Sequence, residues 1–247
     1  MFKYMALYSM IQFVTAMMLN TFGSYLGDIH FLYIDIVLCT SVVVFMGRNK
    51  PFNRISMRKP ITHLMSVPIV FSFTSQTVVQ AIFQTSCYFI LILQPWFVPL
   101  EPDTSSKNIL CFETTTLVIY SFFQYIIMAF LFTPGKPFRT PMYKNKPYTI
   151  SFIVLTLFTL MLLFVPPEPI NKFFEFVELP SPKKVFQMEL VALLLTNILV
   201  SAFIEHCVVT NNRIMNLVAC RCLRKKTKTE DQDAYRLTEI NIDRQTF

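Results

Sequence analysis

Residues 27–47, GDIHFLYIDIVLCTSVVVFMG, have the length of a membrane span and contain an internal carboxylate. A run of this length crosses a hydrocarbon core about 30 Å thick, so Asp35 falls well below the membrane surface. Insertion scales assign a cost of about 2.5–3.5 kcal/mol to an Asp at that depth. We therefore expect Asp35 to face a partner, a cavity or a cationic substrate. The alternative is a capped or protonated Asp that bonds to a neighbouring helix.

Composition extends this reading to the whole chain. Of the 247 residues, 53% are hydrophobic and only 15% are charged, which is too apolar for a soluble core of this length. The sequence predicts an all-α membrane protein, a bundle of six transmembrane helices. The six cysteines show neither metal-ligand spacing nor a disulfide framework.

Six apolar segments are long enough to be candidate spans, and they occupy residues 2–20, 29–47, 64–93, 115–133, 148–165 and 188–209. Residues 1–210 are thus predicted to form a six-span domain, followed by a partly disordered cytosolic tail, basic to mixed in charge, at 211–247. The third span carries Gln76, Gln80 and Gln84 on one helical stripe. A stripe of this kind faces other helices more often than it lines a conduction path.

The charges of the connecting loops predict the orientation. Basic residues follow spans two, four and six, whereas the other connections are acidic or balanced. Cytosolic loops carry the excess of Lys and Arg. Both termini are therefore expected in the cytosol.

Several kinds of chemistry have no sequence support. The chain has no phosphate-binding GxxxxGK[S/T] loop, HExxH motif, nucleophile elbow or kinase signature, and its longest loops leave no room for a soluble catalytic domain. We expect no catalytic residues, no metal site, no nucleic-acid partner and no cofactor in this chain, and no hydrolysis of ATP by the chain alone.

The first span supplies candidate partners for Asp35. Tyr8 and Gln12 are spaced i, i+4 on one helical face, and Tyr4 and Thr15 lie close to the same stripe. A short turn joins the first two spans, so we expect an antiparallel hairpin. A cation there would meet the charge of Asp35, the π face of Tyr8 and the amide oxygen of Gln12.

The outer end of the second span offers one more acidic residue. Asp28 lies two turns before Asp35 on a similar face. It is a further candidate path-lining residue, together with Tyr4 and Thr15, although an exposed residue at the end of a helix is the simpler interpretation.

At these residues the sequence resembles a known family. FKYMALYSMIQF (2–13) followed by LGDIHFLYIDIVL (26–38) is similar to the fifth and sixth membrane helices of the polyamine-transporting subgroup (B) of type V P-type ATPases. The resemblance continues through QPWFVPL (94–100), FQY (123–125) and GKPFRTPMYKN (135–145). Those proteins have ten membrane helices, and this chain resembles the last six.

The resemblance implies a pump that moves polyamines such as spermine or spermidine from a late-endosomal or lysosomal lumen to the cytosol. ATP and Mg²⁺ would be needed only by the full-length relative, through an aspartyl-phosphate. In that family the substrate site includes a Tyr and a Gln of the fifth helix and an Asp of the sixth, which match Tyr8, Gln12 and Asp35.

The DKTGT and TGES motifs, the nucleotide-binding domain and the first four helices of the family are missing from the sequence. The chain is therefore expected to be a fragment or short form, or to associate with the missing half. Two alternatives remain open: a non-catalytic membrane interaction or scaffold protein that pairs with a full-length pump, and a stand-alone cation carrier.

Overall fold

The computed structural model describes residues 1–52, 66–100, 108–133, 135, 138–179 and 183–209. Apart from an isolated bridge between Pro51 and Arg139, the regular structure of these residues is helical. The predicted tail at 211–247 lies outside them.

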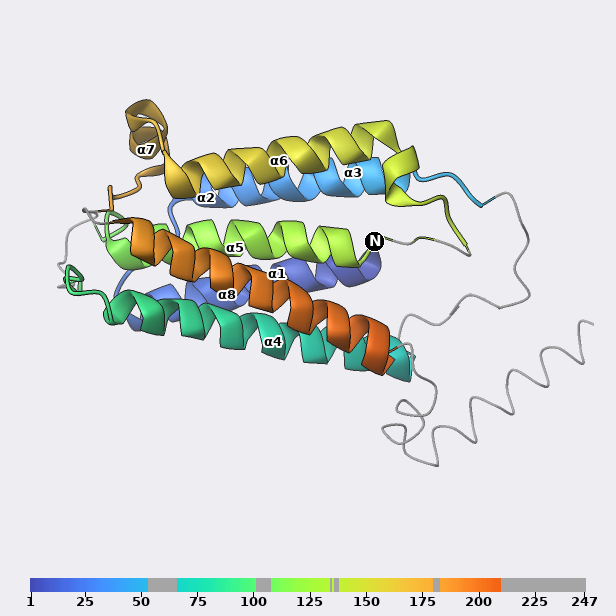
Figure 1. Cartoon of the computed structure of the whole chain (residues 1–247), viewed down its shortest axis with the longest axis horizontal. Helices are drawn as coiled ribbons and strands as arrows, with labels where there is room; N and C mark the ends of the chain where they lie inside the picture. Colours follow the sequence, from blue (N-terminus) through green and yellow to red (C-terminus); the bar gives the residue numbers. More distant parts are fainter. Residues whose placement is uncertain (53–65, 101–107, 134, 136–137, 180–182, 210–247) are drawn as a thin grey trace, which may run out of the picture.

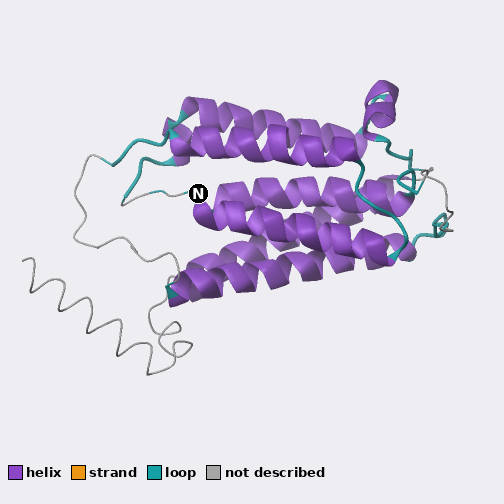
Figure 2. Ribbon diagram, turned by 180° about the vertical axis from the view of Figure 1, so that it is seen from behind, coloured by secondary structure: helices purple, strands orange, loops and turns teal. Residues whose placement is uncertain are grey.

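Long helices run roughly side by side along the molecule (Figure 1). Their bounds are α1 Phe2–Thr21, α2 Asp28–Leu32, η1 Tyr33–Thr40, α3 Ser41–Gly47, α4 Val67–Ile92, α5 Phe112–Leu131, α6 Lys146–Phe164, α8 Lys183–Phe203 and η3 Ile204–Val209. Two short elements, η2 Met142–Lys144 and α7 Glu168–Phe174, lie in the connections. The elements α2, η1 and α3 follow one another without a break and form a single rod, and α7 stands off one end of the bundle (Figure 2).

Local sequence explains where several helices begin and end. Pro68, Pro147 and Pro169 each occupy the first or second helical position, where the missing N–H of proline costs no hydrogen bond. Gly23 follows α1 with φ 77°, a left-handed conformation that glycine adopts without steric cost. The chain therefore turns sharply between α1 and α2.

The core lies around α5. This helix packs against α1, α4, α6, α8 and η1, and all of its residues from Glu113 to Ala129 are buried. The apolar and hydroxyl-bearing sequence of α5 has no charged face to turn outward, as is typical of a central helix.

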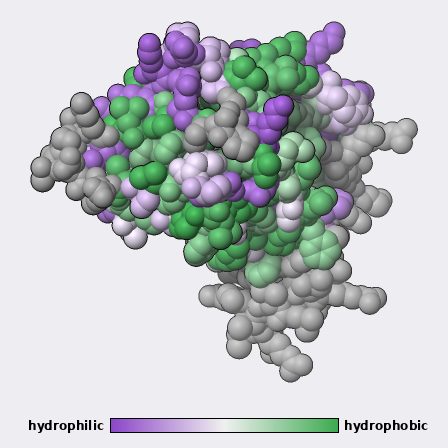
Figure 3. Space-filling view, turned by 60° about the vertical axis from the view of Figure 1, so that its left-hand side comes forward, coloured by the Kyte–Doolittle hydropathy of each residue, from purple (hydrophilic) through white to green (hydrophobic). Residues whose placement is uncertain are grey.

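The outer helices expose apolar side chains. Phe13, Ile82, Leu157 and Leu199 are each more than half exposed, and hydrophobic residues cover a large part of the visible surface in Figure 3. Five helices in the described part of the chain are long and apolar enough to cross a membrane: Phe2–Thr21, Asp28–Gly47, Phe112–Leu131, Lys146–Phe164 and Lys184–His206. The chain is thus a multi-pass membrane domain.

The predicted hairpin of the first two spans is wrong. α1 packs chiefly on α4 and α5, whereas the rod that carries Asp35 packs on α5 and α6. α1 approaches the rod where Met5 Sδ lies 3.7 Å from Cys39 Sγ. The short turn joins the two helices at one end of the bundle. Each helix nevertheless buries apolar side chains against α5, which lies at the centre of the bundle, and not chiefly against the other helix.

Candidate functional site

Asp35 lies in a π-helical segment, η1. The hydroxyl of Thr40 donates to the Asp35 carbonyl at 2.7 Å, and the Ser41 hydroxyl donates to the carbonyls of Val37 and Leu38. Side-chain hydroxyls compete with the regular backbone ladder, and π segments occur frequently at functional sites. The sequence analysis did not predict the π-helical segment, although the adjacent hydroxyl residues Thr40 and Ser41 were a signal for it.

The Asp35 side chain lies on the surface of the described bundle. Ile34 and Leu38 of the same segment are buried against the core, whereas Ile36 and Val37 are exposed like Asp35. Within the described residues, no basic side chain comes within ion-pair distance of the Asp35 carboxylate. The charge is therefore not neutralised by a fixed lysine or arginine of this part of the chain.

Tyr8 and Gln12 are half-buried on α1 and do not hydrogen-bond to Asp35 in the described structure. A third residue lies between the two helices. The ring of Tyr125, on α5, meets the ring of Tyr8 edge-on at a centroid distance of 6.5 Å. Asp35 and Tyr8 both lie within electrostatic range of the Tyr125 hydroxyl.

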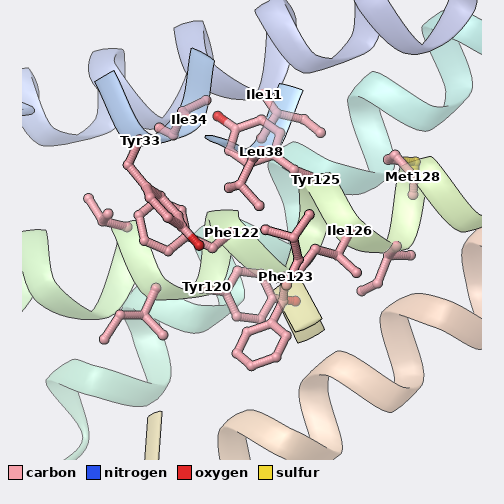
Figure 4. Close-up of a cluster of buried hydrophobic side chains, with 14 of the residues drawn as sticks. Ile11, Tyr33, Ile34, Leu38, Tyr120, Phe122, Phe123, Tyr125, Ile126 and Met128 are labelled. Carbon is pink, nitrogen blue, oxygen red and sulfur yellow. The ribbon is translucent and has the colours of Figure 1, made fainter. Parts of the chain in front are cut away.

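Tyr125 is almost completely buried, in the same cluster as Ile11 of α1 and Ile34 and Leu38 of η1 (Figure 4). The phenol thus lies where α5 packs against both α1 and η1. The sequence analysis did not select Tyr125, because its position depends on which helices α5 contacts.

The three candidate path-lining residues fall in different places. Thr15 is buried, donates to the Ile11 carbonyl at 2.9 Å and accepts from Gln84 at 2.7 Å, so it belongs to the interface between α1 and α4. Tyr4 is also buried, at 1% exposure. Asp28 is exposed in the first turn of α2.

The glutamine stripe of α4 faces other helices, which confirms the preferred interpretation. Gln76, Gln80 and Gln84 are at most 1% exposed. Gln80 exchanges hydrogen bonds with Asn197 at 3.0 and 3.2 Å and donates to Ser201 at 3.1 Å. Gln76 and Gln80 therefore join α4 to α8 through neutral amides, whereas Gln84 joins α4 to α1 and α5.

A second membrane carboxylate was not identified from the sequence. Glu205 lies in the π segment η3, where one oxygen forms an ion pair with Lys3 of α1 and the other accepts from Ser72 of α4 at 2.6 Å. The Lys3 ammonium also lies 4.2 Å from the centre of the Phe132 ring. This cluster fastens α1, α4 and α8 together at one end of the bundle. No group of three or more His, Cys, Asp or Glu side chains suited to a metal ion is found among the described residues.

The described helices thus define a multi-span membrane domain with an exposed carboxylate on one rod. Residues 23–206 match the sequence model of the family described as "Cation transporting ATPase, C-terminus", and the chain belongs to this family.

Similar proteins support the resemblance to polyamine transporters. The chain is 40% identical over 166 residues to Polyamine-transporting ATPase 13A2 of Mus musculus, which covers 67% of this chain and 14% of that protein. It is 31% identical over 251 residues to Polyamine-transporting ATPase 13A3 of Homo sapiens, covering 93% of this chain and 20% of that protein. A "Probable cation-transporting ATPase catp-6" of Caenorhabditis elegans is 37% identical over 182 residues, covering 73% of this chain and 14% of that protein. The chain thus spans about one seventh to one fifth of the length of these relatives.

Proposed function

We propose that this chain is the C-terminal part of the transport domain of an ATP-driven polyamine pump, that Asp35, Tyr8 and Gln12 line its substrate path, and that the buried Tyr125 packs behind Tyr8. The single observation that carries the proposal is the Asp35 carboxylate, which lies within a span and has no basic partner in the described structure. Family membership and the similarity to polyamine-transporting ATPases support the class of substrate.

The energetic argument concerns what covers Asp35. The residue lies seven positions beyond Asp28, about 10 Å along a helix, so it is deep within a bilayer-spanning rod. An ionised carboxylate facing lipid there is costly. We infer that a cationic substrate and further helices of the pump cover this face. The substrate would then neutralise the Asp35 carboxylate, and the helices would cover the exposed apolar side chains around it.

The shape of the site suits a linear polyamine. A flexible chain of ammonium groups and methylenes can present one cation to Asp35 while its apolar spacer lies on the half-buried ring of Tyr8, which packs edge-on against the buried Tyr125 ring. Cation–π attraction is worth about 0.5–2 kcal/mol, and opposite charges about 4 Å apart attract by roughly 4 kcal/mol at an effective dielectric constant of 20. The carboxylate therefore dominates recognition.

We further propose that α4 is the sixth span. It has 26 residues, and the glutamines that lower its hydropathy point into the bundle. The domain then corresponds to the last six helices of a ten-helix pump. ATP and Mg²⁺ would act on the domains of the full-length protein.

Orientation follows from charge. The loops after α3 and α5 meet at one end of the bundle, where the Thr140 N–H donates to the Lys50 carbonyl at 3.0 Å. Arg48, Lys50, Arg139 and Lys144 lie in these two loops. We assign this end to the cytosol and the end with α7 to the lumen of a late endosome or lysosome, the membrane that the resemblance implies.

The test is spermine-dependent turnover of the phosphoenzyme in a full-length ATPase that carries this segment. Asp35→Asn should raise the spermine concentration needed for half-maximal dephosphorylation by at least about 100-fold, since most of the charge attraction is lost. The matched control is Glu189→Gln, which removes an exposed carboxylate bonded to Gln94 on the other side of the bundle. Unchanged spermine dependence in Asp35→Asn would remove Asp35 from the substrate path.

A further inference from the structure

His30 connects the first turn of α2 to the C-terminal end of α7. Its ring is 1% exposed. Nε2 lies 2.6 Å from the Phe174 carbonyl oxygen, and Nδ1 accepts a hydrogen bond from the Gly27 backbone N–H at 3.2 Å. Since a carbonyl can only accept, Nε2 must carry a proton, and Nδ1 must be bare. The ring is therefore a neutral imidazole of one defined tautomer.

Aromatic packing holds the ring in this position. The imidazole is stacked on Phe174 and Phe176, with centroid distances of 6.4 and 5.2 Å. Between these two residues Glu175 adopts a left-handed conformation, with φ 54°, which is uncommon for a residue other than glycine. This conformation sends Phe174 and Phe176 to the same side of the chain, where both cover His30.

Glu175 is placed to respond to a charge on the ring. Its Oε2 lies 3.4 Å from the position that a Cβ on Gly27 would occupy, next to the backbone N–H that bonds to Nδ1. The other charged groups on the surrounding elements are directed elsewhere. Asp28 of α2, Glu168 and Lys172 of α7 and Glu178 beyond it are exposed, and Glu113 of α5 accepts from the Leu100 N–H.

Protonation would break this arrangement. A proton added from solvent at Nδ1 turns it into a donor that faces the Gly27 N–H, and two donors cannot share a hydrogen bond. The Nδ1–H would then need a new acceptor, and the Glu175 carboxylate is the nearest one with a negative charge. The cap of α2 at Gly27 would be released at the same time.

We propose that His30 is a proton-operated latch between the outer end of the Asp35 rod and the segment around α7. With neutral His30 the latch is closed through the bonds to Gly27 and Phe174. With charged His30 the Gly27 bond is exchanged for an ion pair with Glu175, and residues 168–179 loosen from α2. This inference does not require the chain to transport polyamines.

The test is hydrogen–deuterium exchange of the purified chain in lipid nanodiscs between pH 7.5 and pH 5, corrected for the intrinsic pH dependence of exchange. The peptide covering residues 168–179 should lose protection at least about fivefold in the wild type as His30 takes up its proton. His30→Gln should stay protected throughout, because a glutamine amide can donate to Phe174 and accept from Gly27 without titrating. His206→Gln, which replaces an exposed histidine of η3, should behave like the wild type.

Protection that is unchanged across this range in the wild type, or lost equally in His30→Gln, would overturn the proposal. Exchange of the imidazole C2 hydrogen of His30 in the unmodified chain provides a measurement without substitution. A His30 signal that titrates together with the loss of protection supports the latch. A His30 that does not titrate between pH 8 and pH 5 excludes it.

Discussion

Two carboxylates in π-helical segments have opposite surroundings in this molecule. Glu205 in η3 is held by Lys3 and Ser72, whereas Asp35 in η1 has no basic partner among the described residues. A carboxylate matched by a fixed lysine has no remaining charge to offer a ligand. Glu205 therefore fastens helices, whereas Asp35 is the carboxylate to which the proposed function assigns a mobile cation.

The largest change in spermine dependence is expected when Asp35 is given a fixed, positively charged partner. Tyr8→Lys, in a full-length ATPase that carries this segment, places an ammonium on the same side of Tyr125 as the natural phenol. The spermine requirement for dephosphorylation should rise by roughly 1,000-fold, since the added charge offsets about 4 kcal/mol of attraction at about 4 Å. Tyr8→Leu is the control: it removes the ring without adding charge, and a loss as large as that of Tyr8→Lys would refute a charge-based site.

The second change removes the fixed partner from Glu205. Lys3→Met should destabilise the bundle by about 2–3 kcal/mol, somewhat below the cost of breaking a fully buried pair, because both groups retain some exposure. Reversible unfolding of the chain in detergent measures this. Combining Lys3→Met with Glu205→Gln should restore part of the loss. If the double variant lost the sum of the single effects, the two side chains would not be coupled.

A third substitution measures how much the neutral amide network between α4 and α8 contributes to stability, for comparison with the Lys3–Glu205 ion pair. Gln80→Leu removes the bonds to Asn197 and Ser201 and should cost about 1–2 kcal/mol, near the upper values for hydrogen bonds between membrane helices. Thr85→Ala, on the exposed side of α4, should change stability little. Equal losses in the two variants would mean that the amide network does not hold α4 to α8.

The smallest effect is expected from the Tyr125 hydroxyl. Tyr125→Phe should weaken the apparent affinity of the pump for spermine only about twofold to threefold, less than a typical hydrogen bond contributes, because the hydroxyl is buried without a hydrogen-bond partner among the described residues. Tyr120→Phe removes a buried hydroxyl on the same helix, near Asn197, and should leave spermine affinity unchanged. The same shift in both variants would indicate a general packing effect of α5.

The helices were predictable from the sequence, because apolar runs of membrane length leave few alternatives. The glutamine stripe of α4 was also predictable, since three amides at helical spacing need partners inside the bundle. The neighbours of each helix were not predictable. The short turn between α1 and α2 suggested a hairpin, but the central position of α5 depends on contacts between segments far apart in sequence.

The candidate site stays a prediction. Burial within a span and helical spacing selected Asp35, Tyr8 and Gln12, and in the structure Asp35 is exposed while Tyr8 and Gln12 are half-buried. The same spacing could not show that Thr15 bonds to Gln84 instead of facing the path. Tyr125 and the pairing of Glu205 with Lys3 required knowledge of which helices meet, which no local pattern contains.

The most direct test compares Asp35→Asn with Glu205→Gln in a full-length ATPase that carries this segment, measuring the spermine dependence of dephosphorylation and the unfolding temperature of each variant. We predict that Asp35→Asn loses spermine dependence at nearly unchanged unfolding temperature, whereas Glu205→Gln keeps spermine dependence and unfolds at a lower temperature. The reverse pattern, in which Glu205→Gln loses spermine dependence and Asp35→Asn keeps it, would contradict the assignment of Asp35 to the substrate path.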